Sequence, residues 1–367
     1  MKRAHYPGLD VLRIVASLAV LYTHARDWFE AGGQRWRFDE VLTAAVMAPL
    51  RLDAYLVPLG VTTFFLISGL VITQAAFRES PGQFLLRRAT RTLPAMWAVL
   101  LVVWLVALAG VPIGVTGEVT VHTLFANMTL TNFFVPGSTG LNLVTWTLVV
   151  QFVFYLFVAA TIPLLHRWPW LPPALSVTLV SVLLSVVRTE SPVAMHTLRV
   201  VVTLLPILFI GQLVSLVRLG RLHPLAGLAY AVLHWMLLVR GDLTSDHTPG
   251  VPGYPQMLVW IALLAIVFCR MPGDGPAVRW LRGAAKRTYA VFLVHVPVMY
   301  VTPHLISAPE GSTPAFLVAM AGTAVTADLL YRFVEAPAVR WFRGWEKRRG
   351  ETAPELPEHV APQPENR

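Results

Sequence analysis

Ten long stretches of predominantly apolar residues recur along the 367-residue chain. The hydrocarbon core of a bilayer is about 30 Å thick and needs roughly 20 helical residues to cross it. Lipid offers the backbone no hydrogen bonds, and the apolar runs are continuous rather than alternating, so helices are favoured over a barrel. The sequence therefore predicts an all-α, polytopic transmembrane helix bundle with spans at about 9–28, 56–76, 94–111, 142–165, 170–187, 196–217, 222–239, 255–269, 284–303 and 313–334.

The distribution of charge predicts how these spans are oriented. Only 13% of residues are charged, yet the net charge is +9, which in another context would suggest nucleic acid. Here 21 Lys and Arg residues fall on the side that holds the N-terminus and seven on the other side. The positive-inside rule then places both termini in the cytoplasm, so we expect a multi-pass membrane protein in contact with lipid and no nucleic-acid partner.

The chain is expected to form one domain. No repeat of fixed period and no large hydrophilic block is evident, so residues 1–343 are predicted to be a single transmembrane domain. Residues 344–367 form a tail that is basic and then rich in Pro and Glu, with almost nothing apolar to bury. We expect this cytoplasmic tail to be disordered.

Arg13 and His24 lie within the first predicted span, eleven residues apart. That separation is close to three helical turns, so they share one face and lie about 16 Å apart along the axis. Ionisable residues in a span usually face the bundle interior or a wet cavity. Arg13 could instead reach the headgroups, and His24 could be satisfied by a neighbouring helix. A neutral imidazole facing a cavity would suit a general base that takes a proton from an alcohol.

Arg87, Arg88 and Arg91 lie in the predicted loop between the second and third spans, just before Pro94. They could be ordinary inner-side charge. They also suit a phosphate clamp, because guanidinium groups match phosphate oxygens bidentately and stay charged. With Arg13 on the same side, this pattern predicts a phosphorylated ligand entering from the cytoplasm.

Six segments resemble, in the same order, the motifs of the acyltransferase-3 family of integral membrane O-acyltransferases. The first contains that family's spacing of an Arg, ten residues and a His, met here by Arg13 and His24. The resemblance covers residues 6 to about 343. The segments are LDVLRIVASLAVLYTH (9–24), FFLISGLVIT (64–73), RRATRTLPAMW (87–97), TWTLVVQFVFYL (145–156), TYAVFLVHVP (288–297) and RFVEAPAVRWF (332–342).

The resemblance implies an acyltransferase of a bacterial-type plasma (inner) membrane. Acyl-CoA, most commonly acetyl-CoA, would bind from the cytoplasm as a co-substrate, with no permanently bound cofactor. The acyl group would pass to a hydroxyl of a carbohydrate, glycolipid or secondary metabolite. It also implies that His24 is the catalytic histidine, that Arg13 is its paired arginine, and that Arg88 and Arg91 are the cytoplasmic arginine pair.

Further residues of the matching motifs are expected to line the site: Trp146, Gln151, Tyr289, His295 and Glu335. Many relatives have a Glu where this chain has Gln151. If that Glu orients the histidine, Gln can hydrogen-bond it but cannot stabilise an imidazolium by charge, so activity could be slower, differently partnered or absent. Glu335, near the inner face, is expected to pair with Arg13 or Arg332.

Other readings stay open at this point. A transporter or flippase of a glycosylated or lipid-linked molecule could line its pathway with the same residues, although the chain shows no matched halves. A catalytically weakened relative is a third interpretation. Ser68 is expected to hydrogen-bond its own helix. The histidines lack a spacing such as His-Glu-x-x-His, so no metal is expected. The sequence favours no particular acceptor, acyl-chain length or oligomeric state.

Overall fold

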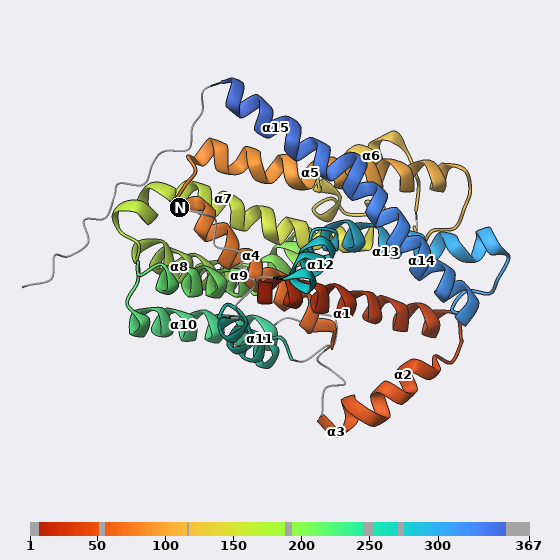
Figure 1. The fold of residues 1–367 in the computed structure, drawn as a ribbon, viewed down its shortest axis with the longest axis horizontal. Coiled ribbons are helices and arrows are strands. Elements are labelled where there is room, and N and C mark those ends of the chain that lie inside the picture. The colour runs from red at the N-terminus through yellow and green to blue at the C-terminus, as the bar shows by residue number, and fades with distance from the viewer. Residues whose placement is uncertain are drawn as a thin grey trace, which may run out of the picture.

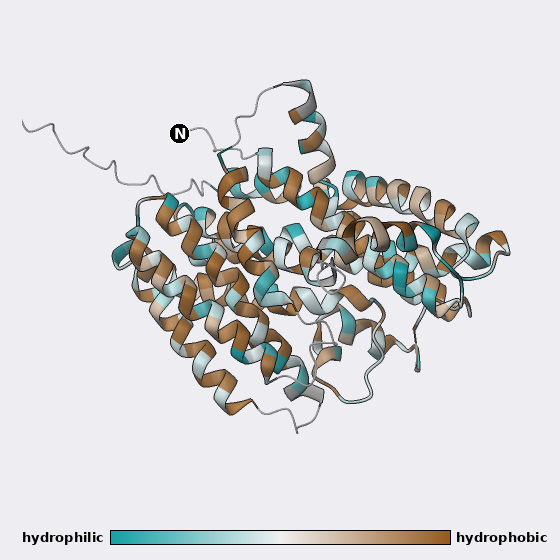
Figure 2. Cartoon of the chain, turned by 90° about the horizontal axis from the view of Figure 1, so that it is seen from below, coloured by the Kyte–Doolittle hydropathy of each residue, from teal (hydrophilic) through white to brown (hydrophobic). Residues whose placement is uncertain are grey.

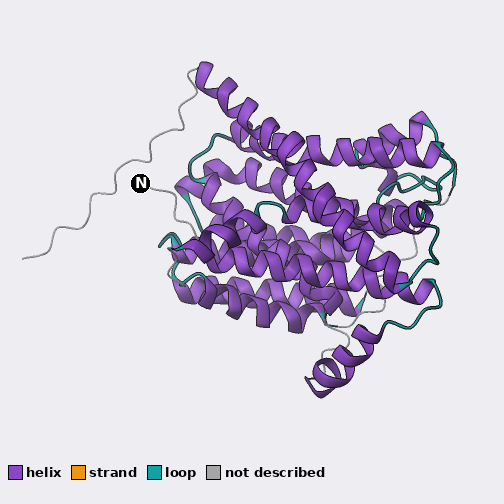
Figure 3. Ribbon diagram, turned by 45° about the vertical axis from the view of Figure 1, so that its right-hand side comes forward, coloured by secondary structure: helices purple, strands orange, loops and turns teal. Residues whose placement is uncertain are grey.

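Helices account for all the regular secondary structure of the described residues (Figures 1 and 3). The computed structural model describes residues 7–50, 56–115, 117–187, 193–244, 253–270 and 275–349. The predicted all-α bundle is confirmed. Its elements are α1 (Pro7–Ala31), α2 (Arg37–Leu42), η1 (Thr43–Met47), α3 (Ala48–Leu50), α4 (Leu56–Ala76), α5 (Pro81–Leu108), α6 (Val121–Met128), η2 (Thr131–Phe133), η3 (Leu143–Thr145), α7 (Trp146–Arg167), α8 (Leu171–Val186), α9 (Val193–Arg218), α10 (Pro224–Leu243), α11 (Tyr254–Phe268), α12 (Pro276–Ala285), α13 (Thr288–Ile306), α14 (Thr313–Leu330), η4 (Tyr331–Glu335) and α15 (Ala336–Arg348).

Eight of the helical segments in the described ranges are long and apolar enough to cross a membrane. Two shorter apolar helices, α8 and α11, coincide with the remaining predicted spans. Hydrophobic residues extend along all the long helices in Figure 2. The count of ten spans and the cytoplasmic position of both termini remain predictions.

The third span begins earlier than the sequence predicted. The span was expected at about 94–111, but α5 begins at Pro81 and continues through Pro94. Ser80 caps the helix: its hydroxyl accepts from the Gln83 amide at 3.4 Å, and the Ser80 amide donates to the Gln83 side chain at 3.3 Å. Pro81 then occupies the first turn, where its missing N–H costs nothing. The predicted arginine loop is therefore wrong, because Arg87, Arg88 and Arg91 lie on a helix.

The last span also runs beyond its predicted end. α14, the π-helical segment η4 and α15 continue without a break from Thr313 to Arg348. These 36 residues would measure about 54 Å as a straight helix, more than a bilayer core requires. The predicted boundary between 343 and 344 thus falls inside α15, and residues 350–367 of the predicted tail lie outside the described residues.

α4 and α9 cross at very close range through two glycines. A Cβ added at Gly69 would lie 2.0 Å from the Leu208 carbonyl oxygen, and one added at Gly211 would lie 2.2 Å from the Leu66 carbonyl oxygen. Small residues at such crossings let membrane helices pack backbone to backbone. Gly69 belongs to the FFLISGL segment, so this part of the motif has a packing role that positions α4.

We expect Gly69→Ala to destabilise the protein by about 1–3 kcal/mol, because the added methyl group forces α4 and α9 apart. The measurement is the thermal unfolding midpoint of the purified protein in detergent. Gly82→Ala is the matched control, because a Cβ there meets nothing within 4 Å. An unfolding midpoint for Gly69→Ala equal to that of Gly82→Ala would contradict the proposed crossing.

Candidate active site

Two cavities lie one beyond the other along the bundle, and α1, α7 and α13 each contribute residues to both. The basic cavity is lined by Arg13, Val61, Phe64, Phe65, Ser68, Val71, Ile72, Arg88, Arg91, Thr92, Thr147, Leu148, Gln151, Tyr155, Ala285, Lys286, Thr288, Tyr289 and Phe292. The histidine cavity is lined by His24, Asp27, Leu143, Trp146, Val296, Met299 and Tyr300.

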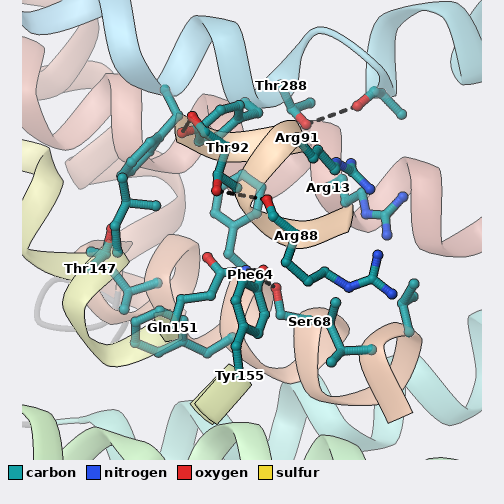
Figure 4. Close-up of a pocket in the computed structure, with 18 of the residues that line it drawn as sticks. Arg13, Phe64, Ser68, Arg88, Arg91, Thr92, Thr147, Gln151, Tyr155 and Thr288 are labelled. Atoms are coloured by element: carbon teal, nitrogen blue, oxygen red, sulfur yellow. Dashed lines mark hydrogen bonds between the residues drawn. The ribbon is translucent and has the colours of Figure 1, made fainter. Parts of the chain in front are cut away.

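Four cationic side chains line the basic cavity: Arg13, Arg88, Arg91 and Lys286. The guanidinium groups of the three arginines gather on one side of the pocket in Figure 4. The Nη1 atom of Arg13 lies 3.4 Å from Oδ1 of Asp10. The Nη2 atom of Arg88 forms an ion pair with Oε2 of Glu79 at 3.0 Å. Arg91 and Lys286 are exposed and form no ion pair with an acidic residue in the described ranges. These two cations can therefore bind an anionic ligand without first breaking an ion pair.

Arg87 does not line either cavity. Its guanidinium group lies between two carboxylates, 3.0 Å from Glu79 and 2.8 Å from Glu346. Both carboxylates are buried. The structure thus separates Arg87 from the two arginines with which the sequence grouped it, and gives it the role of joining α15 to α5.

The polar wall of the basic cavity is formed by Gln151 and its two partners. The Gln151 amide donates to the Ser68 hydroxyl at 3.1 Å and to the Tyr155 hydroxyl (Figure 4). Two expectations are corrected here. Ser68 bonds to a neighbouring helix rather than to its own. Gln151 lines a different cavity from His24, because α7 presents Trp146 to the histidine cavity and Gln151, more than one turn later, to the basic cavity.

Tyr289 and Glu335 occupy different positions relative to the basic cavity. Tyr289 lines it and donates to the Thr92 carbonyl at 2.9 Å, which ties α13 to α5. Glu335 is buried in η4 and lines neither cavity. The sequence predicted an ion pair of Glu335 with Arg13 or Arg332, and this prediction is wrong. Arg332 instead pairs with Asp328 at 2.7 Å. The Oε2 atom of Glu335 has no hydrogen-bond partner among the described residues.

His24 faces a second histidine. The ring centroids of His24 and His295 are 5.2 Å apart. Contrary to the sequence prediction, His295 is buried and lines neither cavity. Its Nδ1 lies 3.1 Å from the Val291 carbonyl oxygen. A carbonyl can only accept, so Nδ1 carries the proton and Nε2 of the neutral ring is an acceptor. That Nε2 atom has no hydrogen-bond partner among the described residues.

A row of aromatic rings lies between the two cavities. The centroid of Phe292 is 6.2 Å from that of Phe64 and 6.2 Å from that of His295, which in turn faces His24. Phe64 and Phe292 line the basic cavity, whereas His24 lines the other one. The two cavities share no lining residue within the described part of the chain, so this row of side chains separates them.

Sequence reasoning missed two charged residues of the site. Asp27 lines the histidine cavity with His24, and its position three residues later on the same helix was a usable signal. Lys286 lines the basic cavity, but its place depends on how α12 packs against α1, which no local pattern discloses. No group of three His, Cys, Asp or Glu side chains that could hold a metal occurs in the described ranges.

These features define a class of protein: a membrane-spanning helix bundle in which α1 contributes an arginine to a cationic cavity and a histidine to a second cavity. The family model described as an acyltransferase domain matches residues 6–332. The chain therefore belongs to the acyltransferase-3 family.

Part of the chain is also similar to a curated protein. The chain is 29% identical over 185 residues to Nodulation protein 10 from Rhizobium leguminosarum bv. viciae. The alignment covers 45% of this chain and 46% of that protein, so the chain spans about half the length of the relative it matches. No solved structure matches.

Proposed function

We propose that this protein is an O-acyltransferase that moves an acyl group, most commonly acetyl, from cytoplasmic acyl-CoA to a hydroxyl of a carbohydrate, glycolipid or secondary metabolite. The observation that carries the proposal is the arrangement on α1. Arg13 lines a cavity with three further cations, and His24, about 16 Å along the same helix, lines the next cavity.

The basic cavity supports an acyl-CoA donor by its charge and its size. Arg91 and Lys286 would bind the phosphates, with Arg13 and Arg88 beside them. The cavity volume is about 130 Å³, below the roughly 300–1,000 Å³ of ordinary ligand sites. It therefore suits the narrow pantetheine arm rather than the nucleotide, which would remain at the mouth.

The reaction requires one proton to move through His24. The acceptor oxygen bonds to the thioester carbonyl carbon while its proton passes to the imidazole. The carbon–sulfur bond then breaks, the electron pair leaves on the CoA sulfur, and the imidazolium returns the proton to that sulfur. The products are an ester and free CoA.

Two neighbours of His24 support this role. Asp27 lines the same cavity and would stabilise the imidazolium by charge, the contribution that Gln151 cannot make. His295 lines neither cavity, so it would act through its contact with the His24 ring, which would hold the imidazole in place for the acceptor hydroxyl.

The experiment that tests the proposal uses purified protein in lipid nanodiscs with acetyl-CoA labelled in the acetyl group. We expect free CoA to be released in proportion to label incorporated into a hydroxyl ester. Comparing surface glycans and secreted metabolites by mass, with and without the gene, would identify the acceptor as the molecule that loses one acyl increment. The proposal fails if no active preparation consumes acyl-CoA and no acyl increment is lost.

We expect Gln151→Glu to weaken acyl-CoA binding rather than to increase turnover. The new carboxylate would lie in the cavity lined by Arg13 and Arg88, where it competes with the phosphates for cations. The KM for acyl-CoA should rise about ten-fold, as expected for about 1.4 kcal/mol, while kcat at saturation stays close to that of the wild type. Ser68→Ala, which removes a hydrogen-bond partner without adding charge, is the control. A higher kcat for Gln151→Glu would instead support the weakened-relative interpretation.

A further inference from the structure

Two helices of this chain carry nearly the same sequence. PAVRWLRGAAKR (276–287) and PAVRWFRGWEKR (337–348) are identical at nine of twelve positions. The first covers α12, and the second covers all but the first residue of α15. Ala285 and Lys286 of the first copy line the basic cavity, but that cavity does not account for the Arg-Trp pair that both copies carry.

The two copies expose the same side chains. Trp280 is 71% exposed and Trp341, its counterpart, is 65% exposed. The arginines that precede them, Arg279 and Arg340, are also exposed. The apolar residue between the shared arginines is less exposed: Leu281 is half-buried and Phe342 is buried. Each copy therefore presents a tryptophan beside an arginine on its outer surface.

The fold places both copies at the same end of one helical hairpin. α13 and α14 pack side by side, α12 leads directly into α13, and η4 and α15 follow directly after α14. The hairpin is antiparallel, so the start of α13 and the end of α14 face the same side of the membrane. The distribution of Lys and Arg predicts that this side is the cytoplasmic one.

Three exposed arginines of the repeat have no acidic partner among the described residues. Arg279, Arg340 and Arg343 form no ion pair with an acidic residue in the described ranges, unlike Arg287 and Arg332, which both pair with Asp328. Exposed tryptophans are typical of the membrane–water interface, where the ring lies at the level of the headgroups. Basic residues at that level attract anionic lipids.

We propose that the two Arg-Trp helices bind the headgroups of anionic phospholipids of the cytoplasmic leaflet. Each tryptophan inserts at the interface, and the adjacent arginine binds a lipid phosphate. This would fix both ends of the α13–α14 hairpin at one depth. α13 carries Tyr289, Phe292 and His295, so the bound lipid would also hold the site helix in place.

The test measures how many phosphatidylglycerol molecules remain bound to the full chain, by native mass spectrometry from nanodiscs that contain both phosphatidylglycerol and phosphatidylcholine. We expect Arg279→Gln/Arg340→Gln to lower retention of phosphatidylglycerol about ten-fold or more, since one basic residue near an anionic surface contributes about a five-fold effect. Retention of phosphatidylcholine should not change. Arg279→Lys/Arg340→Lys keeps the charge and should retain most of the binding.

Arg35→Gln/Arg37→Gln is the matched control, with the same change of charge in an exposed segment on the predicted outer side. Equal loss in the control, equal loss of both lipids, or unchanged retention in Arg279→Gln/Arg340→Gln would each overturn the proposal. Displacement of phosphatidylglycerol by inorganic phosphate would overturn it in favour of a site for free anions. Neither Arg279 nor Arg340 lines a cavity, so acyl transfer by wild-type protein tests the proposed function separately.

Discussion

We expect His24→Ala to transfer acyl groups about 10²–10⁴-fold more slowly than the wild type, the usual contribution of a positioned general base. Alanine cannot accept the proton of the attacking hydroxyl, whereas the cations of the basic cavity are unchanged, so the KM for acyl-CoA should stay near its original value. The measurement is the initial rate of label transfer from acetyl-CoA in nanodiscs, normalised to the amount of folded protein.

His122→Ala is the control for this variant, because His122 is an exposed histidine on α6 and lines neither cavity. Its rate should equal that of the wild type. A normal rate for purified His24→Ala would exclude His24 as the base. Loss of insertion in His24→Ala would be detected by its amount in the membrane fraction, and His24→Gln, which keeps polarity and approximate size, would then be measured in its place.

Replacing Arg91 with glutamine should raise the KM for acyl-CoA about 10- to 100-fold. Hydrogen bonds to charged groups contribute roughly 1.5–3 kcal/mol, and Arg91 is one of the two cavity cations not already paired with a carboxylate in the described ranges. The turnover number at saturating acyl-CoA should change little, since the interaction is made in the ground state and transition state alike. A titration of initial rate against acyl-CoA concentration gives both constants.

Arg37→Gln provides the control for Arg91→Gln. It removes the same charge from an exposed residue that lines neither cavity. Equal KM values for the two variants would show that net charge, rather than a contact at the cavity, governs binding of acyl-CoA. Unchanged KM in both would remove Arg91 from the phosphate site and leave Lys286 as the unpaired candidate.

The length and continuity of the apolar runs were enough to predict the helices, because a bilayer permits few other structures. The predicted start of the third span was wrong, because the continuous apolar run begins near 94 whereas the helix begins at the Ser80 cap. The helix continues through Pro94 because a proline inside a membrane helix is tolerated where neighbouring groups satisfy the freed carbonyl. The extension of the last helix through α15 was missed because its amphipathic residues have too few apolar side chains to register as a span.

The candidate site was predictable where it depended on a single helix. Arg13 and His24 both face cavities as their spacing indicated. The separation of Gln151 from His24 depends on where α7 lies relative to α1. The contact between the His24 and His295 rings depends on how α1 packs against α13. Such contacts join residues far apart in sequence, so no periodicity or spacing specifies them. Arg87 was misplaced for the same reason, because its partner Glu346 lies 259 residues away.

The aromatic row of Phe64 and Phe292 has a consequence for the living cell. An enzyme with one opening toward the cytoplasm and another toward the exterior would let ions leak down their gradients if water filled the whole path. Closely packed apolar rings exclude a continuous column of water, as hydrophobic constrictions do in closed channels. If the protein transfers an acyl group outward as we propose, this row would help the membrane to keep its voltage during the transfer.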